Sequence, residues 1–297
     1  MIYDGFLTIS EALVSQEELP PVLDEQLDVE LFKYKFKTYP SLIIMGEAMS
    51  KLNNFDFTML NRNLKTLKIS HWHLKAEKDL RKIKAMVRGQ KITPERQPVM
   101  ARYVDQYNRI DLSPDVPAIS LKHEVMHAAS SRTAGLNTKC GMSMVGTNIC
   151  CDGELLTMVA RDMGRQLNWG YELNELYTDY LLAVKLNQDR FQLPGITELM
   201  VELEKLFEGK LITLYSQGEG FKIQNHLIDQ LTLEELRTLN HLLVAYHRIN
   251  KITKEERYTT SDYIQYFGQQ TAPVHETVIN QLTGARLRRI RNNIHNN

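Results

Sequence analysis

Apolar residues recur three and four positions apart over much of this chain, which places them on one face of an α-helix. Alternation of apolar and polar residues, the pattern of a half-buried strand, occurs in short stretches. One of these, ARYVDQYNRIDL at residues 101–112, predicts two strands joined by a polar turn. The pattern predicts an α+β fold that is mainly helical and contains a small sheet.

The N-terminal third mixes both patterns. Residues 40–53 have helical spacing, and FDFTMLNRNLKTLKIS predicts a short helix that leads into a strand at about residues 64–69. A basic helical run follows at residues 75–91. Residues 89–98 form a polar stretch with two prolines, and we expect the first domain boundary there.

The rest of the chain divides between glycine-rich and helical sequence. Residues 131–170 are rich in glycine and predict loops or short hairpins. Within them, GMSMVGTNICCDGE is a candidate wall or flap of a cleft, and the alternative, which we favour slightly, is that Met142 and Met144 only pack against the core. From residue 195 we expect a succession of helices, with a capping box at Thr232 and Glu235. We divide the chain into an N-terminal mixed segment, a central part and a helical C-terminal part, at residues 1–98, 99–190 and 191–297.

The stretch SLKHEVMHAAS at residues 120–130 contains the pattern H-E-x-x-H. His123 and His127 are four residues apart, so on a helix both imidazoles can bind one metal ion. Glu124 lies about 100° further round the helix, beside such an ion but outside the ligand pair. That is the position of a general base for a metal-activated water. Helical spacing and start signals support a helix here, the latter at Ser113, Pro114 and Asp115.

The pattern is short enough to arise by chance, so a metal site needs a third ligand. A metzincin sequence would continue to a glycine and a third histidine, but those positions hold Ser130 and Thr133. In LNELYTDY, at residues 173–180, Glu175 and Asp179 share one helical face while apolar residues occupy the other. A buried carboxylate pair requires positive charge opposite it, which zinc would supply.

HEVMH followed by NELYTD resembles the gluzincin zinc metallopeptidases, the thermolysin-like group. YNRIDL and GYELNELYTDYL are also similar to uncharacterised bacterial proteins with a zincin core. The resemblance implies a zincin-like catalytic core at residues 99–190, with the small sheet beside the H-E-x-x-H helix and an edge strand that can pair with an extended peptide. The interval between the two motifs is longer than we expect for thermolysin, which implies a distant relative with an insertion.

The same resemblance assigns residues. It implies one Zn²⁺ per chain held by His123, His127 and Glu175, with Glu124 as the general base. Asp179 would hold a ligand imidazole in its tautomer and orientation, and Asn174 would brace the site.

Composition narrows the class of protein. Lys plus Arg and Asp plus Glu are both 36, so net charge gives no argument for nucleic acid, and a hydrophobic content of 43% is that of a globular chain. We see no secretory signal, no apolar run long enough to span a membrane and no disulfide framework among the three cysteines. We therefore expect a cytoplasmic protein without nucleic-acid or membrane partners, with export by a route that reads other signals left open.

Several other residues are weaker candidates. His71 and His73 would share a face if they lay on a strand, but they lack a third ligand. The spacing of Cys140, Cys150 and Cys151 does not fit a structural zinc site. An oxyanion could be stabilised by a Tyr or His, among which the sequence does not choose: His226, His241, His247, Tyr215, Tyr258 and Tyr263.

Together these features predict a zinc-dependent metallopeptidase that acts on a peptide or protein. The ion would polarise the scissile carbonyl, and Glu124 would take a proton from the activated water. The alternative is a catalytically silent zincin-fold binding or regulatory protein, against which the intact Glu124 argues. A third hypothesis, a nucleic-acid or partner-binding protein that uses residues 75–91 and the arginines near the C-terminus, is weakened by the neutral charge.

Overall fold

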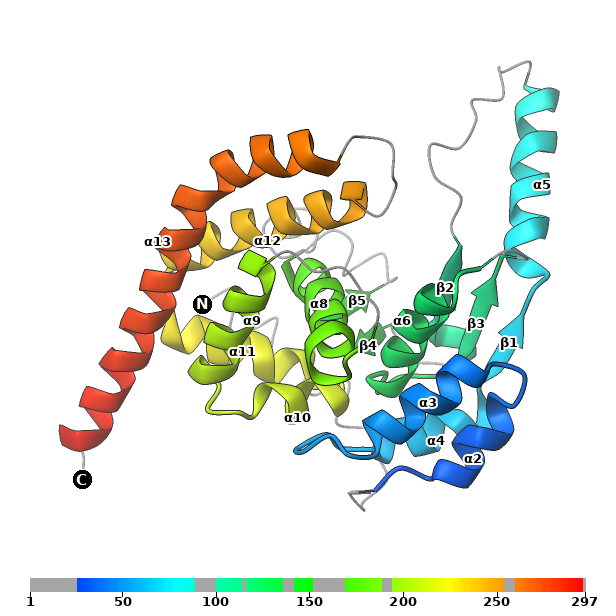
Figure 1. The fold of residues 1–297 in the computed structure, drawn as a ribbon, viewed down its shortest axis with the longest axis horizontal. Coiled ribbons are helices and arrows are strands. Elements are labelled where there is room, and N and C mark those ends of the chain that lie inside the picture. Colours follow the sequence, from blue (N-terminus) through cyan, green and yellow to red (C-terminus); the bar gives the residue numbers. More distant parts are fainter. Residues whose placement is uncertain are drawn as a thin grey trace.

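The computed structural model describes residues 26–88, 100–113, 116–135, 142–151, 169–188, 194–253 and 260–295. These residues are mainly helical, with a three-stranded and a two-stranded sheet, which confirms the expected α+β, mainly helical class. In Figure 1 the three-stranded sheet and its neighbouring helices occupy one side of the molecule, and the C-terminal helices occupy the other. Helix α8 lies between the two sides.

The N-terminal helices are α2 (Val29–Lys35), α3 (Pro40–Met49) and α4 (Thr58–Thr66). The helix in α4 is longer than expected, and the strand that follows it, β1, is Lys68–Ser70. The prediction of a strand at residues 64–69 was therefore wrong for its first four residues and right for Lys68 and Ile69. Leu60 and Leu64 lie four positions apart and are both fully buried, so packing against the core favours a helix there.

The three-stranded sheet has the order β1-β3-β2. Strand β2 (Ala101–Val104) runs antiparallel to β3 (Arg109–Leu112), as expected from the sequence, with Tyr103 opposite Ile110. A short 3₁₀ helix (Asp105–Tyr107) and the left-handed Asn108 (φ 43°) join them. Strand β1 pairs with β3 in parallel. Strand β1 precedes residue 98, whereas β2 and β3 follow it, so the domain boundary that we expected there divides the strands of one sheet.

Two helices flank this sheet. Helix α5 (His73–Val87) matches the expected basic helical run, packs on β3 and projects beyond the sheet (Figure 1). Helix α6 (Ala118–Ala129) contains H-E-x-x-H and lies against β2 and α4. It begins directly after Pro117 rather than at the earlier start signals, of which Pro114 and Asp115 lie outside the described residues.

The expected hairpin is formed by β4 (Met142–Val145) and β5 (Asn148–Cys151), which pair antiparallel. Helix α8 (Trp169–Tyr180) continues into a π-helical turn (Leu181–Lys185). The C-terminal part is the expected succession of helices: α9 (Pro194–Leu206), α10 (Leu211–Ser216), α11 (Gly220–Gln230), α12 (Leu233–Thr253) and α13 (Thr260–His295).

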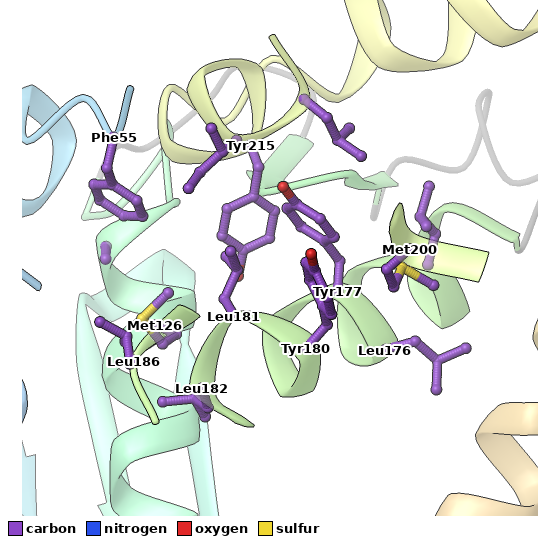
Figure 2. Close-up of a cluster of buried hydrophobic side chains, with 14 of the residues drawn as sticks. Phe55, Met126, Leu176, Tyr177, Tyr180, Leu181, Leu182, Leu186, Met200 and Tyr215 are labelled. Atoms are coloured by element: carbon purple, nitrogen blue, oxygen red, sulfur yellow. The ribbon is translucent and has the colours of Figure 1, made fainter. Parts of the chain in front are cut away.

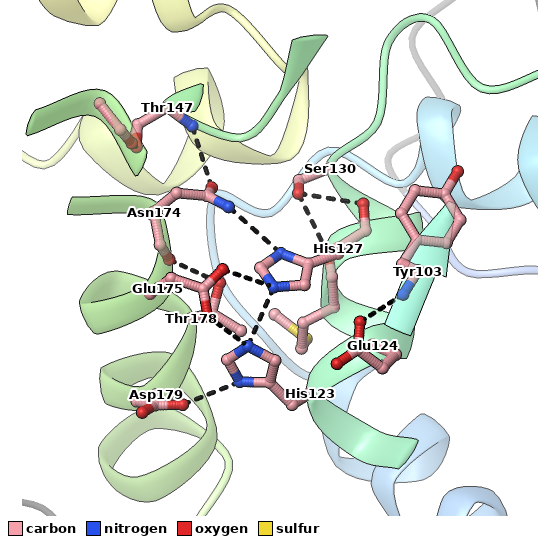
Figure 3. A network of polar contacts seen from close by, with 12 residues as sticks. Tyr103, His123, Glu124, His127, Ser130, Thr147, Asn174, Glu175, Thr178 and Asp179 are labelled. Atoms are coloured by element: carbon pink, nitrogen blue, oxygen red, sulfur yellow. Dashed lines mark hydrogen bonds and ion pairs between the residues drawn. The ribbon is translucent and has the colours of Figure 1, made fainter. Parts of the chain in front are cut away.

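Buried residues from α2 to α13 form one hydrophobic core cluster. Figure 2 shows its part around α8, where Tyr177 and Tyr180 point towards Tyr215 of α10. All three tyrosines are at most 1% exposed. The face of α8 that bears Glu175 points instead towards α6 (Figure 3), so α8 meets protein on both faces, as the sequence predicts. In the part of the chain that the structure describes, no helix is both long and apolar enough to span a membrane.

Candidate metal centre

Helices α6 and α8 bring three potential metal ligands together. His123 and His127 lie one turn apart on α6, and Glu175 projects from α8 between them (Figure 3). The two Nε2 atoms are 2.9 Å apart. Oε2 of Glu175 lies 3.1 Å from Nε2 of His123, and Oε1 lies 3.2 Å from Nε2 of His127. The spacing of four residues on α6 and the approach of Glu175 from α8 thus form a three-residue cluster.

This cluster fits zinc in both chemistry and spacing. Two imidazole nitrogens and one carboxylate are a common set of three protein ligands at catalytic zinc sites. Zinc bonds of about 2.0–2.1 Å in a tetrahedron place neighbouring donor atoms roughly 3.3 Å apart. Here the two Nε2 atoms are 2.9 Å apart, and each lies 3.1 or 3.2 Å from its own oxygen of the Glu175 carboxylate. One ligand atom from each of the three residues lies within 4.8 Å of the other two. The cluster is also the one group of three possible metal ligands found among the described residues.

The charges around His123 favour a cation. Its Nδ1 lies 2.8 Å from Oδ1 of Asp179, which is 1% exposed, and its Nε2 faces Glu175. Burial lowers the pKa of His123, but the carboxylates of Asp179 and Glu175 outweigh burial and raise that pKa to about 9. In the same way, burial raises the pKa of Glu175, and the two histidines outweigh it and hold that pKa well below its usual value. The buried site therefore has the charge to hold a positive ion.

His127 is braced through Asn174. Nδ2 of Asn174 lies 3.2 Å from Nδ1 of His127, and Oδ1 of the same amide accepts a hydrogen bond from the backbone N–H of Thr147 at 3.1 Å. Thr147 lies in the turn between β4 and β5, next to Gly146 (φ 56°). A Cβ at residue 146 would lie 2.1 Å from Oδ1 of Asn174, so only glycine permits this approach. The hairpin thus supports the cluster through Asn174.

Glu124 lies on α6 outside the ligand set and points towards β2 (Figure 3). Its Oε2 accepts a hydrogen bond from the backbone N–H of Tyr103 at 2.6 Å. The N–H of Ser113 donates to the carbonyl of Met100, so the alternation of an antiparallel pair turns the N–H and C=O of Ala101 and Tyr103 away from β3. Strand β2 is an edge strand. Glu124 therefore lies between the ligand cluster and the outer edge of the sheet.

Tyr171 is a residue of the site that the sequence did not single out. It lies on α8 one turn before Glu175, and burial together with the carboxylates of Glu175 and Glu124 raises its pKa. Its ring packs on that of His247 from α12, with centroids 5.5 Å apart. It is still 44% exposed. Its position four residues before Glu175 on the same helical face is the sequence signal that could have found it.

The other candidates for an oxyanion-stabilising residue are a buried tyrosine, two histidines of α11 and α12, and two tyrosines whose side chains lie outside the described part of the chain. Tyr215 is fully buried and hydrogen bonds to Thr178, His226 packs on Phe207, and His241 is exposed. Tyr258 lies outside the described residues, and the side chain of Tyr263 is likewise not described. Of the six candidates that the sequence offers for stabilising an oxyanion, His247 is the one whose ring contacts Tyr171.

Among the described residues, the remaining histidines and cysteines form no group of three possible metal ligands. His71 follows β1 and lies 3.1 Å from the hydroxyl of Tyr39, whereas His73 is the first residue of α5, so the two are not alternate residues of a strand. Cys140 and the side chains of Cys150 and Cys151 lie outside the described part of the chain.

The C-terminal end of α6 is held by α4. Nδ2 of Asn63 donates hydrogen bonds to the carbonyls of Ala128 and Ser131, both at 2.8 Å. The guanidinium of Arg62 donates to the carbonyls of Ser131 and Arg132. These carbonyls have no helical partner of their own, so α4 satisfies them and fixes the end of the helix that bears His127.

Comparison of the chain with protein-family models, with curated proteins and with solved structures found no match.

Proposed function

We propose that this chain is a zinc-dependent metallopeptidase with a zincin-like core. The observation that carries the proposal is the convergence of His123, His127 and Glu175, next to a glutamate that takes no part in the cluster. A purely structural zinc site is normally closed by four protein ligands, whereas a catalytic site keeps a position open. Three donors and an adjacent Glu124 fit a catalytic site.

His123, His127 and Glu175 would hold the ion. When bound, zinc supplies a Lewis acid that polarises a carbonyl and makes a water molecule more acidic. Asp179 accepts the hydrogen bond from Nδ1 of His123 and so fixes the tautomer that presents Nε2.

Glu124 moves the proton. Its Oε2 is held by the N–H of Tyr103, which orients the carboxylate and leaves Oε1 to accept a proton from the attacking water. The same oxygen then passes the proton to the amine that leaves. A glutamine at residue 124 has a similar shape but cannot carry out this transfer.

The edge of β2 favours an extended peptide as substrate. Ala101 turns its N–H and C=O away from β3, beside the edge group that holds Glu124. A peptide that pairs there gains backbone hydrogen bonds, and its scissile bond lies near the cluster. Tyr171 and His247, on the side of α8 and α12, are the hydrogen-bond donors that we assign to the developing oxyanion.

One observation favours the alternative of a catalytically silent zincin-fold protein. The 2.6 Å bond from Tyr103 to Glu124 occupies the proposed base with a structural contact. If that contact were its whole role, Glu124→Gln would leave the function of the protein unchanged.

Metal content tests the site. We expect about one zinc per chain by mass spectrometry of protein purified without added metal, and loss of that zinc in Glu175→Ala. Glu172→Ala is the matched control, because Glu172 is a glutamate of α8 outside the cluster. Wild type that fails to bind zinc even when zinc is supplied contradicts the proposal.

Activity tests the chemistry. Wild-type protein and Glu124→Gln, both loaded with zinc, are incubated with an unbiased peptide library, and the products are read by mass spectrometry. We expect cleavage by the wild type and a loss of at least about 10²-fold in the variant. Equal zinc content with no cleavage by either protein supports the silent alternative.

A further inference from the structure

Helix α5 carries an apolar stripe on its exposed surface. Leu80, Ile83 and Val87 are 56%, 53% and 82% exposed and lie on one face of the helix together with Ala76. Five of the 14 exposed large hydrophobic residues in the described part of the chain fall between Trp72 and Val87. Figure 1 shows no other described helix or strand beside the outer half of α5. Apolar surface gathered in this way marks a binding surface.

The charge of α5 indicates what covers the stripe. The helix contains five basic residues and two acidic ones, in a chain whose net charge is zero. Lys75 and Lys84 are exposed. An occupant that complements this helix is acidic and carries an apolar stripe of its own.

Residues 1–25 of the same chain have both properties. They contain six acidic residues and no Lys or Arg: Asp4, Glu11, Glu17, Glu18, Asp24 and Glu25. Their apolar residues Ile2, Phe6, Ile9 and Leu13 are separated by four, three and four positions. The residues of the α5 stripe have the same separations: Ala76, Leu80, Ile83 and Val87. Two stripes of equal length and equal period are the pattern of paired amphipathic helices.

The chain connection permits the contact. The carbonyl of Gln26 accepts a hydrogen bond from Asn61 of α4 at 2.9 Å. The distance from Gln26 to the first residue of α5 is therefore at most about 40 Å, because the chain from Asn61 to α5 cannot span more even if the residues between α4 and α5 are fully extended. Residues 13–26 span up to about 43 Å. Leu13 can therefore lie at the base of α5, with Ile2 towards its far end.

We propose that residues 1–18 bind along α5 of the same chain, antiparallel to it. Ile2, Phe6, Ile9 and Leu13 lie against Val87, Ile83, Leu80 and Ala76, in that order, and the acidic side chains lie among the basic ones. A tether of this length gives the segment an effective concentration near the millimolar range, which favours it over a second copy of the chain. This inference is independent of the metal centre.

Cross-linking tests the pairing directly. The three native cysteines are replaced by serine, and a short bismaleimide is added to a variant with Leu13→Cys and Ala76→Cys. The matched control carries Leu13→Cys and Lys75→Cys, because Lys75 neighbours Ala76 but lies on another face of the helix. We expect a cross-link within one chain in the first variant and much less in the control. Equal yields in both, or cross-linked dimers in place of monomers, overturn the proposal.

Amide hydrogen exchange of residues 74–87 tests the stripe in the full chain. Phe6→Asp with Ile9→Asp places charge on the proposed contact, whereas Thr8→Asp with Ser15→Asp adds the same charge on the opposite face. We expect exchange in α5 to rise about tenfold or more in the first variant and to stay unchanged in the second. Exchange that is equal in the wild type and both variants overturns the proposal. The proposal is also overturned if the wild-type chain binds anionic phospholipid vesicles and Leu80→Asp abolishes that binding, because the stripe would then bind a lipid surface.

Discussion

The side-chain nitrogen of Asn174 faces Nδ1 of His127, while the oxygen of the same amide is held by the N–H of Thr147. An imidazole nitrogen that accepts from an amide carries no proton, so the ring proton of a neutral His127 lies on Nε2. That atom faces Glu175. Metal binding through Nε2 requires the proton on Nδ1 instead, so zinc binding in the wild type would turn the amide of Asn174 to present its own oxygen to His127.

Asn174→Asp supplies an oxygen to both neighbours without a turn of the side chain. We expect this variant to bind zinc at least as tightly as the wild type, because His127 can keep its proton on Nδ1. Asn174→Leu removes the partner of the ring, and we expect zinc affinity to fall about 10- to 100-fold. Competition with a chromogenic chelator measures both values. An aspartate variant that binds zinc no better than the leucine variant would contradict this account of the tautomer.

The ring of Tyr171 packs on that of His247, and the carboxylates of Glu175 and Glu124 act on Tyr171. We expect Tyr171 and His247 to act on the transition state rather than on the metal. Tyr171→Phe removes a hydroxyl and preserves the ring contact with His247. We expect kcat to fall about 10²- to 10³-fold, with KM and zinc content nearly unchanged. Steady-state kinetics on the peptide identified from the library measures this.

Tyr107→Phe is the control for that experiment, because Tyr107 is also exposed but lies in the turn between β2 and β3. If the Tyr171→Phe enzyme keeps the wild-type kcat, Tyr171 does not stabilise the oxyanion. A rise in KM alone would assign Tyr171 to substrate binding.

The candidate ligands could be predicted from the sequence because each pair is local. His123 with His127, and Glu175 with Asp179, depend only on a spacing of four residues within one helix. Local signals also predict that both helices form and that a capping box precedes α12. Thr232 and Glu235 do form the reciprocal hydrogen bonds that the sequence predicts, at 2.7 and 3.3 Å.

The contacts that complete the site depend instead on how distant segments meet. The bond from Tyr103 to Glu124 requires the register of β2, and the caps from Asn63 require α4 to pack on the end of α6. The first part of the strand expected at residues 64–69 was wrong for a similar reason. Burial of Leu64 against the core, which residue spacing does not reveal, extends α4 through Thr66.

Glu235 links the start of α12 to α13, because both of its oxygens lie 3.1 Å from the guanidinium of Arg288. Burial raises the pKa of Glu235, but the hydrogen bonds from Thr232 and Arg288 outweigh it, so the pKa lies below its ordinary value. A carboxyl with a lowered pKa stabilises the fold above its unfolded value, and this contribution is lost as pH falls through the folded value.

We therefore expect Glu235→Gln to lower the free energy of unfolding by about 0.5–1 kcal/mol at pH 7, with the difference disappearing as the pH falls below 4. Urea denaturation of the wild type and the variant across this pH range measures it. Glu234→Gln is the control, since Glu234 makes the same charge change on the exposed side of the same turn. A difference that grows on acidification would contradict the assignment.

Asn63 is 1% exposed, and its amide satisfies the carbonyls of Ala128 and Ser131. Asn63→Leu keeps the volume but leaves the carbonyl of Ala128 without this donor, since Arg62 still reaches only Ser131 and Arg132. We expect the free energy of unfolding of the metal-free protein to fall by about 1–3 kcal/mol, the cost of a buried unsatisfied polar group. Denaturation in the presence of a chelator measures it, with Asn53→Leu, at an exposed site, as the control. Because Ala128 follows His127 directly, the same variant should also bind zinc more weakly, and unchanged stability together with unchanged zinc affinity would show that α4 does not hold this end of α6.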